Sequence, residues 1–356
     1  MNTHKPKIAM LVSGGVDSAV SLALLKDQGA DVTAFYLKIW LEDELAFLGN
    51  CPWEDDLNYA QQVCSQLGVE LKVVSLQREY WDNVVAYTIA QAKAGRTPNP
   101  DILCNQMIKF GCFYDKAGQG FDYIATGHYA QVKMENGKAV LMRSPDPIKD
   151  QTYFLSHLSQ EQLQKAMFPI GHLLKSQVKH IAATKGLAPA ERKESFGICF
   201  LGKISFNEFL RHHLGDKPGN FVEFETGKIM GQHKGYWYHT IGQRKGIGLH
   251  GGPWYVLSKD IEKNIVYISC QYHDENKKRD TFSVADCHWI SGTAPEMANL
   301  LVKLRHGPAL AQCTLNLSSE TDGIVHLTEN DQGIAPGQFA VFYDDQICLG
   351  SGVMGL

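Results

Sequence analysis

One short unit near the N-terminus constrains the fold more than any other part of the chain. The apolar stretch Lys7 to Val12 predicts a buried strand, and the string SGGVDS, Ser13 to Ser18, follows it directly. Val16 to Asp27 then predicts a helix that ends near Gly29. Two glycines let the backbone turn tightly and approach a ligand, while the helix start offers unpaired N–H groups and a positive dipole end. This unit predicts a phosphate cradle.

Two comparisons limit what this cradle can be. The string matches neither the GxxxxGK[ST] loop nor the GxGxxG dinucleotide fingerprint, which disfavours both of those nucleotide-binding classes. The simpler alternative is an ordinary strand-to-helix turn in which a serine or aspartate caps the helix.

The first 200 residues alternate apolar runs with amphipathic stretches, as repeated strand and helix units do. Parallel strands need helical crossovers of this length, so the pattern predicts an α/β fold with a doubly wound parallel sheet. The expected strands are 7–12, 32–38, 70–76 and 123–126, and the expected helices are 16–27, 55–67, 80–94, 102–117 and 175–184.

The pattern changes twice beyond this sheet. Two β-like runs flank Asn136-Gly137, which predicts a hairpin inserted on the sheet domain. A short helix is expected over 206–214, and short strands separated by glycine-rich turns then predict a small C-terminal β-barrel or sandwich. We expect three domains: a sheet domain over 1–205, a central β-rich domain over 206–278 and a β-barrel domain over 279–356.

Composition excludes several classes. No apolar run approaches the roughly 18 residues of a membrane span, and the N-terminal run is too short for a signal peptide, so we expect a cytoplasmic protein with no membrane partner. Nine cysteines without a CxxC pair argue against a disulfide scaffold and a structural zinc site. A net charge of −4 is not that of a protein that grips nucleic acid over its whole surface, so any RNA contact must be local.

Two cysteines lie in distinctive surroundings. Asp101 can begin a helix after two stiffening prolines, which would place Cys104 near that helix N-terminus, where thiolate is favoured. Cys199 lies between apolar neighbours in SFGICF. Either cysteine alone is more often buried packing. Together they indicate more, because a thiol that carries transferable sulfur needs a second thiol to resolve the S–S bond by exchange.

The SGGVDS string resembles the signature of the PP-loop ATP pyrophosphatases, which cleave ATP between its α and β phosphates. The resemblance implies that ATP, with accompanying Mg²⁺ and no metal cluster of protein ligands, binds along this loop. The implied ATP-binding residues are Leu11, Val12, Ser13, Gly14, Gly15, Val16, Asp17, Ser18, Leu37 and Gly127.

Four further strings, PNPDILCN, GHYA, KDQTYFL and GICF, occur in order, and with them nearly the whole chain resembles the bacterial tRNA-specific 2-thiouridylases. This resemblance implies adenylation of O2 of the wobble uridine (position 34) of tRNA and its replacement by sulfur, with release of AMP and pyrophosphate. It implies that Cys199 carries a persulfide, that Cys104 is the nucleophile and forms a transient disulfide with Cys199, and that Asp101 is the acid or base.

The same resemblance implies the partners, which are tRNA and a sulfur donor, either a cysteine desulfurase or a sulfur-relay protein. The implied contacts to the target base and tRNA are Asn99, Pro100, Asp101, His128, Lys149, Asp150, Gln151, Arg305, His306 and Gln338. His306 replaces the aromatic residue expected after Arg305, and the region 41–52, with Cys51, departs from the family's variable acidic loop.

Two alternative functions are consistent with part of these sequence features. One is a PP-loop sulfurtransferase or adenylating ligase that acts on another substrate, although a simple ligase needs no cysteine pair. The other is a noncatalytic RNA-binding protein that retains a nucleotide-binding fold.

Overall fold

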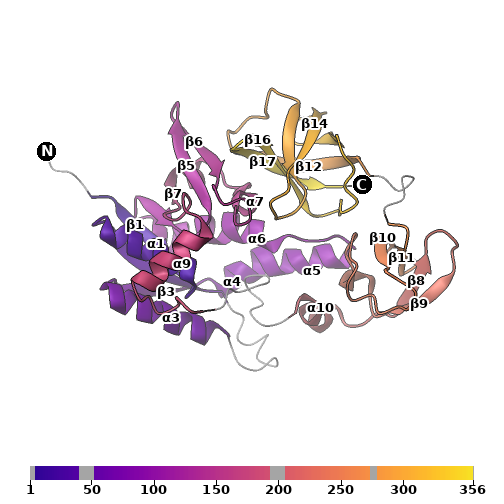
Figure 1. The fold of residues 1–356 in the computed structure, drawn as a ribbon, viewed down its shortest axis with the longest axis horizontal. Coiled ribbons are helices and arrows are strands. Elements are labelled where there is room, and N and C mark those ends of the chain that lie inside the picture. The colour runs from indigo at the N-terminus through magenta and orange to yellow at the C-terminus, as the bar shows by residue number, and fades with distance from the viewer. Residues whose placement is uncertain (1–4, 40–51, 193–204, 273–278, 356) are drawn as a thin grey trace.

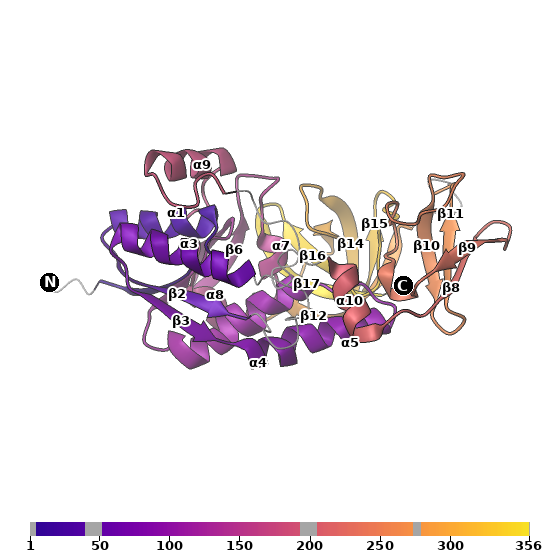
Figure 2. The ribbon, with the colours of Figure 1, turned by 90° about the horizontal axis from the view of Figure 1, so that it is seen from below.

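The computed structural model describes residues 5–39, 52–192, 205–272 and 279–355. Cys199 and Cys51 lie outside these residues. Figures 1 and 2 show three parts along the long axis, with the parallel-sheet domain at one end, the central domain at the other and the C-terminal barrel between them.

The sheet domain is built on five parallel strands in the order β3-β2-β1-β4-β7. Their bounds are β1 Lys7–Leu11, β2 Asp31–Lys38, β3 Leu71–Ser75, β4 Tyr123–Ala125 and β7 Ala166–Met167. The four strands predicted from the sequence are therefore confirmed within one residue at each end. The short strand β7, which completes the sheet beside β4, was not predicted.

Each face of this sheet is covered by helices, as expected for a doubly wound fold. Alternate residues of β1 point to opposite faces, so Ile8 and Met10 enter one core while Ala9 and Leu11 enter the other. The first core is covered by α1 Val16–Asp27, α3 Pro52–Leu67 and α9 Lys175–Thr184. The second is covered by the helical stretch that follows β3.

That stretch is less regular than the predicted helices over 80–94 and 102–117. It contains three π-helical segments, in which hydrogen bonds run from residue i to i+5, a geometry that is rare and frequent at functional sites. The segments in chain order are α4 Gln77–Tyr80, η2 Trp81–Val85, α5 Ala86–Lys93, α6 Pro100–Leu103, η3 Cys104–Cys112 and η4 Tyr114–Gly118. Periodicity alone predicted their helical character, whereas the widened turns were not foreseen.

The hairpin predicted around Asn136-Gly137 is confirmed, and it has a second role. Strands β5 Ala130–Glu135 and β6 Lys138–Arg143 are joined by these two residues, both at positive φ (49° and 79°). Strand β6 also pairs with the C-terminal strand β17, so the hairpin extends the wall of the barrel. Two short helices follow it, α7 Thr152–Leu155 and α8 Gln160–Lys165.

The central domain begins with α10 Phe206–Leu214, where Ser205 and Glu208 form a capping box. Its four-stranded sheet has the order β10-β11-β8-β9. The elements are β8 Gly219–Glu223, β9 Ile229–His233, the short helix η5 Tyr236–Tyr238, β10 Tyr255–Asp260 and β11 Ile265–Ser269.

The C-terminal domain is a closed barrel of six antiparallel strands, which decides between the barrel and the sandwich expected from the sequence. The order is β12-β15-β14-β13-β16-β17, and pairing of β12 with β17 closes it. Closure covers the edges of these strands, and the start of β17, beyond its pairing with β12, is covered by β6. The bounds are β12 Thr281–Trp289, β13 Asn299–Lys303, β14 Ala311–Leu317, β15 Gly323–Leu327, β16 Phe339–Asp344 and β17 Ile347–Met354.

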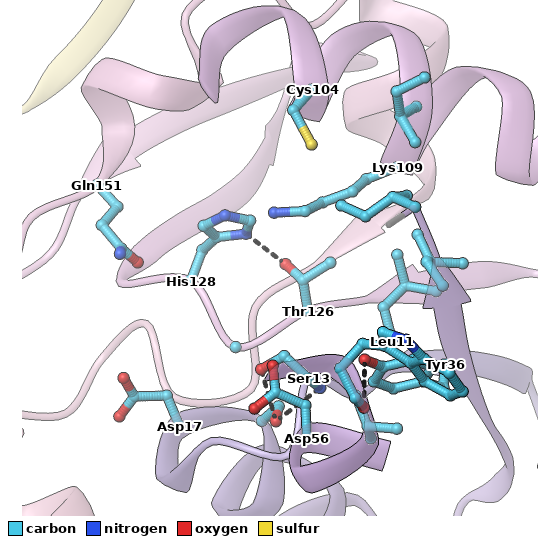
Figure 3. Close-up of a pocket in the computed structure, with 17 residues that line it drawn as sticks. Leu11, Ser13, Asp17, Tyr36, Asp56, Cys104, Lys109, Thr126, His128 and Gln151 are labelled. Atoms are coloured by element: carbon cyan, nitrogen blue, oxygen red, sulfur yellow. Dashed lines mark hydrogen bonds between the residues drawn. The ribbon is translucent and has the colours of Figure 1, made fainter. Parts of the chain in front are cut away.

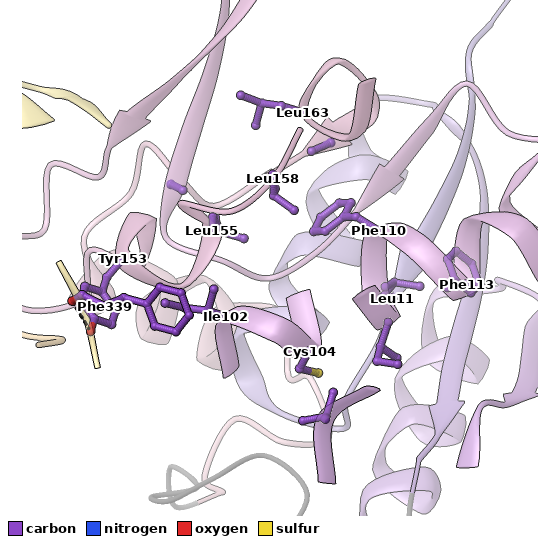
Figure 4. Packing of buried hydrophobic residues seen from close by; sticks show 14 of the residues in the cluster. Leu11, Ile102, Cys104, Phe110, Phe113, Tyr153, Leu155, Leu158, Leu163 and Phe339 are labelled. Atoms are coloured by element: carbon purple, nitrogen blue, oxygen red, sulfur yellow. Dashed lines mark hydrogen bonds between the residues drawn. The ribbon is translucent and has the colours of Figure 1, made fainter. Parts of the chain in front are cut away.

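The barrel and the sheet domain share one hydrophobic core. Phe339 and Tyr343 of β16 belong to the same buried cluster as Ile102 and Tyr153 of the sheet domain, and Figure 4 shows Phe339 against Tyr153. The Tyr153 hydroxyl donates to the Phe339 carbonyl at 3.1 Å.

A buried ion pair lies at the same junction. Lys303 Nζ on β13 is 2.7 Å from Asp150 Oδ2, and neither side chain is exposed to solvent. Arg143 Nε lies 3.4 Å from the same oxygen, and the Thr152 hydroxyl donates to Asp150 Oδ1 at 2.9 Å. A carboxylate without solvent is stable only if it is paired and hydrogen-bonded, so Asp150 ties the barrel to the sheet domain.

This pair gives a stability prediction. Lys303→Met leaves Asp150 buried beside one more distant cation, Arg143. Because a buried charge then lacks its partner, we expect the free energy of the first unfolding transition to fall by about 3–5 kcal/mol. Thermal or urea unfolding of the full chain measures this. Lys263→Met is the matched control, because Lys263 pairs with Asp260 at the surface and such pairs contribute below about 1 kcal/mol. Equal effects of the two substitutions would contradict the structural role of Lys303.

Candidate functional site

One cavity lies at the carboxyl ends of the neighbouring strands β1 and β4. Open α/β sheets bind ligands at this kind of topological switch point. The cavity has a volume of about 310 Å³, and Figure 3 shows the residues around it. Ten of the predicted site residues line it: Leu11, Val12, Ser13, Asp17, Ser18, Leu37, Cys104, Gly127, His128 and Gln151.

The loop after β1 is held by its own hydroxyl group. Ser18 Oγ accepts from the Ser13 N–H at 3.2 Å and donates to the Gly15 carbonyl at 3.0 Å. Gly15 is the N-cap residue of α1, and no side chain caps the helix, which contradicts the simple capped-turn alternative. Gly14 adopts φ +74°, and a Cβ there would lie 2.2 Å from the Asp56 carbonyl oxygen. Such a tight, uncapped loop at a helix start suits an anion.

Gly127 permits the closest approach to this loop. A Cβ at Gly127 would lie 2.8 Å from the backbone nitrogen of Ser18 and 2.9 Å from the carbonyl carbon of Asp17. Only a glycine lets the segment after β4 pass so close to the first turn of α1.

Asp17 is fixed by two residues that sequence reasoning missed. Its Oδ1 accepts from the Tyr129 hydroxyl at 2.8 Å and lies 2.7 Å from Lys175 Nζ. Lys175 is itself buried, at the start of α9. Tyr129 could have been found, because it directly follows Gly127-His128. Lys175 had no local sequence signal, since it lies 158 positions from Asp17.

A second carboxylate, Asp56 on α3, also lines the cavity and was also missed. It forms an ion pair with Arg192, whose Nη1 donates to the Gly14 carbonyl at 2.9 Å. The Arg192 guanidinium also lies over the Tyr59 ring, 4.6 Å from its centroid. Arg192 therefore connects the loop to helix α3.

Cys104 lies across the cavity from the loop, as Figure 3 shows, and its side chain is buried. The helix begins at Pro100 with Asn99 at the N-cap, so the expectation that Asp101 begins it is wrong by one residue. The Cys104 N–H already donates to the carbonyls of Pro100 and Asp101. Cys104 is thus in the second turn, where the orphan N–H groups of a helix start no longer face it.

Two polar residues complete this side of the cavity. Lys109 Nζ donates to Asn105 Oδ1 at 2.9 Å, and Asn105 Nδ2 donates to the Phe154 carbonyl at 2.9 Å. His128 Nδ1 is 2.7 Å from the Thr126 hydroxyl. Burial first, and then the positive charge of Lys109, hold the pKa of His128 well below its usual range, so His128 is neutral.

The predicted RNA-contact residues fall into separate places. Gln151 lines the cavity, where its Oε1 accepts from the Tyr129 N–H at 2.9 Å. Lys149 is half-buried beside it in sequence. Asp150 is buried in its ion pair with Lys303, so a direct RNA contact is not available to its side chain in this conformation.

The barrel residues among these predictions meet the sheet domain instead of the cavity. Gln338 Nε2 donates to the carbonyls of Thr97 and Pro98, and Asn99 Nδ2 lies 3.4 Å from Gln338 Oε1. Gln338 and Arg305 line a second hollow of about 680 Å³ between the three domains.

Arg305 and His306 are both exposed but already have neighbours. Arg305 forms a two-point ion pair with Asp331, at 3.0 and 2.8 Å. The His306 ring packs 4.7 Å from the ring of Phe154. Cys199 lies outside the described residues, so its distance from Cys104 stays a prediction.

In ranges 5–39, 52–192, 205–272 and 279–355, no group of three or more histidine, cysteine, aspartate or glutamate side chains could hold a metal ion. Within that same part of the chain, no helix is long and apolar enough to cross a membrane.

Comparison with known proteins places the chain in a family. Family models match three consecutive parts: a tRNA methyl transferase HUP domain over residues 6–203, a tRNA methyl transferase PRC-barrel domain over 207–270 and an aminomethyltransferase beta-barrel domain over 279–354.

Several curated relatives resemble the chain over nearly its whole length. The tRNA-specific 2-thiouridylase MnmA of Parabacteroides distasonis is 47% identical over 98% of this chain and 98% of its own. The tRNA-specific 2-thiouridylase MnmA 2 of Bacteroides fragilis is 48% identical over 98% and 99%, and MnmA 1 of Bacteroides thetaiotaomicron is 47% identical over 97% and 98%. The chain therefore belongs to the tRNA-specific 2-thiouridylase family.

Proposed function

We propose that this protein is an ATP-dependent tRNA uridine 2-sulfurtransferase, which adenylates O2 of the wobble uridine, position 34, and replaces that oxygen by sulfur. One observation carries the proposal: a single cavity holds both the SGGVDS loop and the buried thiol of Cys104. A simple adenylating ligase needs no thiol opposite its phosphate cradle. The relatives that match over nearly the whole chain are named 2-thiouridylases, which supports the same choice.

The cavity has a polar side that suits the phosphates of ATP and an apolar side that suits its base. The loop from Ser13 to Ser18 offers hydroxyl groups and backbone N–H groups for phosphates, while Leu37, Ile39 and Trp53 form an apolar wall for the base. Mg²⁺, carried in with ATP, would find oxygen ligands at Asp17 and Asp56 and would neutralise phosphate charge. Those two carboxylates and the serine hydroxyls fit a hard cation.

The first step converts O2 of the uridine into a group that can leave. The C2 carbonyl oxygen of uridine cannot leave as such, so O2 attacks the α-phosphorus of ATP, the bond to the β-phosphate oxygen breaks, and pyrophosphate departs. The new O2–AMP group can leave as AMP. We assign Asp101, at the second position of α6, as the acid or base for protons at the target base, with Asn99 and Pro100 beside it.

The second step transfers sulfur. The terminal sulfur of a Cys199 persulfide attacks C2 and displaces AMP, and the Cys104 thiolate then attacks the Cys199 sulfur, which releases 2-thiouridine. In the other order, Cys104 attacks first and releases hydrosulfide, which displaces AMP. Both routes leave a Cys104–Cys199 disulfide, and a thiol reductant must supply two electrons to restore both thiols.

The proposed reaction needs a tRNA substrate and a sulfur donor, and it divides the work among the three domains. The substrate is tRNA, and the persulfide comes from a cysteine desulfurase or a sulfur-relay protein, in the cytoplasm. We assign the chemistry to a domain over 1–205 and tRNA contacts to this domain and the domains over 206–278 and 279–356. His128, Lys149, Gln151, Arg305, His306 and Gln338 stay candidate contacts.

The close contact between Gly127 and the first turn of α1 allows a test of ATP binding. Gly127→Ala pushes a methyl group into the first turn of α1, so we expect ATP to bind at least tenfold more weakly, about 1.4 kcal/mol, in equilibrium dialysis. Gly120→Ala is the control, because no atom lies within 4 Å of a Cβ at Gly120. ATP affinity unchanged in Gly127→Ala would place the nucleotide elsewhere.

The two cysteines test sulfur transfer. We expect Cys199→Ser and Cys104→Ser to abolish 2-thiouridine formation while ATP binding, and tRNA-dependent exchange of pyrophosphate into ATP, persist. Mass spectrometry of nucleosides from tRNA incubated with enzyme, ATP and a persulfide source measures the product. Full 2-thiouridine formation by Cys199→Ser would refute the persulfide assignment, and absent exchange in the unaltered protein would refute adenylation.

A further inference from the structure

The π-helix η3 brings Cys104 and Lys109 to the same cavity. In an α-helix of 3.6 residues per turn, side chains five positions apart point about 140° away from each other. In a π-helix the hydrogen bond runs from i to i+5, so a residue five positions on lies about one turn away. The Phe113 N–H donates to the Ile108 carbonyl in this pattern, and Cys104 and Lys109 both line the cavity.

The charge of Lys109 is not neutralised by a carboxylate among the described residues. Its Nζ donates to the neutral amide oxygen of Asn105, which the Phe154 carbonyl holds in place. In Figure 3 its ammonium group points into the cavity toward His128, and after burial the charge of Lys109 is the second cause that lowers the pKa of His128.

The other titratable residues of the cavity have partners of their own. Asp17 bonds Lys175 and Tyr129, and Asp56 pairs with Arg192. The Tyr36 hydroxyl donates to the Trp53 carbonyl, and His128 is neutral. Among the described residues that line the cavity, Lys109 is the one lysine or arginine.

Several charged residues on the segments that pack against η3 have partners of their own, and none of these residues lines the cavity. Glu79 on α4 pairs with Lys116, Asp82 on η2 pairs with Arg78, and Lys165 on α8 bonds Tyr114. Asp101, on α6, precedes Cys104 by three positions and is the nearest carboxylate along the chain.

We propose that Lys109 is a positioning residue that stabilises the thiolate of Cys104 and so prepares it for sulfur transfer, an inference that rests on the proposed function. A nearby cation favours the charged form of a thiol, and a partly desolvated cavity strengthens that attraction. The thiol proton passes to water, and no bond forms to Lys109. The helix start expected from the sequence cannot supply this charge, because Cys104 lies in the second turn.

Ionisation of Cys104 can be measured in the full-length protein without tRNA, ATP or a sulfur donor. Iodoacetamide alkylation is followed from pH 5 to 10, and mass spectrometry of the peptide that contains Cys104 separates it from the other cysteines. The pH midpoint reports ionisation, whereas the plateau rate reports access. We expect Lys109→Met to raise the midpoint by about 1 pH unit, which is about tenfold slower alkylation near neutral pH.

Two variants separate charge from packing. Lys109→Arg keeps the charge and should keep the midpoint near that of the unaltered protein. Lys116→Met removes a lysine of η4 that bonds Ser75 and Glu79 away from the cavity, and should change nothing. Circular dichroism confirms that each variant is folded.

Two results would overturn the inference: an unchanged midpoint in Lys109→Met, or equal midpoints in the Met and Arg variants. An unchanged midpoint together with tenfold weaker ATP binding would make Lys109 a phosphate ligand. Alkylation of Cys104 needs no turnover. A missing 2-thiouridine product would therefore refute the proposed function, whereas the alkylation midpoints would still test the role of Lys109.

Discussion

The buried contact between Lys303 and Asp150 fixes the relation of the barrel to the sheet domain, and the site depends on that relation. Around it, β6 pairs with β17 and Tyr153 packs on Phe339, so the junction is a continuous core. The docked barrel in turn holds residues 97–99 through Gln338. Those residues lead directly into α6 and Cys104, so a contact outside the cavity sets the position of the thiol inside it.

The cavity combines two electrostatic environments. On the loop side, each carboxylate already has a cation, Asp17 with Lys175 and Asp56 with Arg192, so the negative charges that would repel a polyphosphate are compensated. On the thiol side, Lys109 donates to the amide oxygen of Asn105 and lies near a histidine whose pKa burial lowers. The SGGVDS loop and Cys104 thus lie on separate walls of one cavity.

Much of the architecture followed from the sequence, for identifiable reasons. The predicted strands of the parallel sheet, helices α1, α9 and α10 and the Asn136-Gly137 hairpin carry local signals in periodicity, capping and turn chemistry. The SGGVDS loop and Cys104 were also found from local strings. The π-helices were missed because their side-chain pattern reads as an α-helix, and β7 because two residues carry no periodicity.

The remaining site residues were missed because tertiary contacts alone define them. Lys175 reaches Asp17 across 158 positions, and Arg192 reaches Asp56 across 136. Asp150, which a family motif marks as a tRNA contact, is buried against Lys303, and local sequence gave no sign of this ion pair. Burial of a charge depends on what folds over it, which local sequence does not contain.

The hairpin formed by β5 and β6 has a consequence for how the chain can be divided. Strand β6 belongs to the first domain in sequence but to the barrel wall in space. A fragment ending at residue 205 would present the outer edge of β6 unpaired, with N–H and C=O groups open to another chain, and unprotected edges of this kind invite self-association. Residues 1–205 are therefore not a structurally separate module, because part of one strand edge is covered by a strand from the far end of the chain.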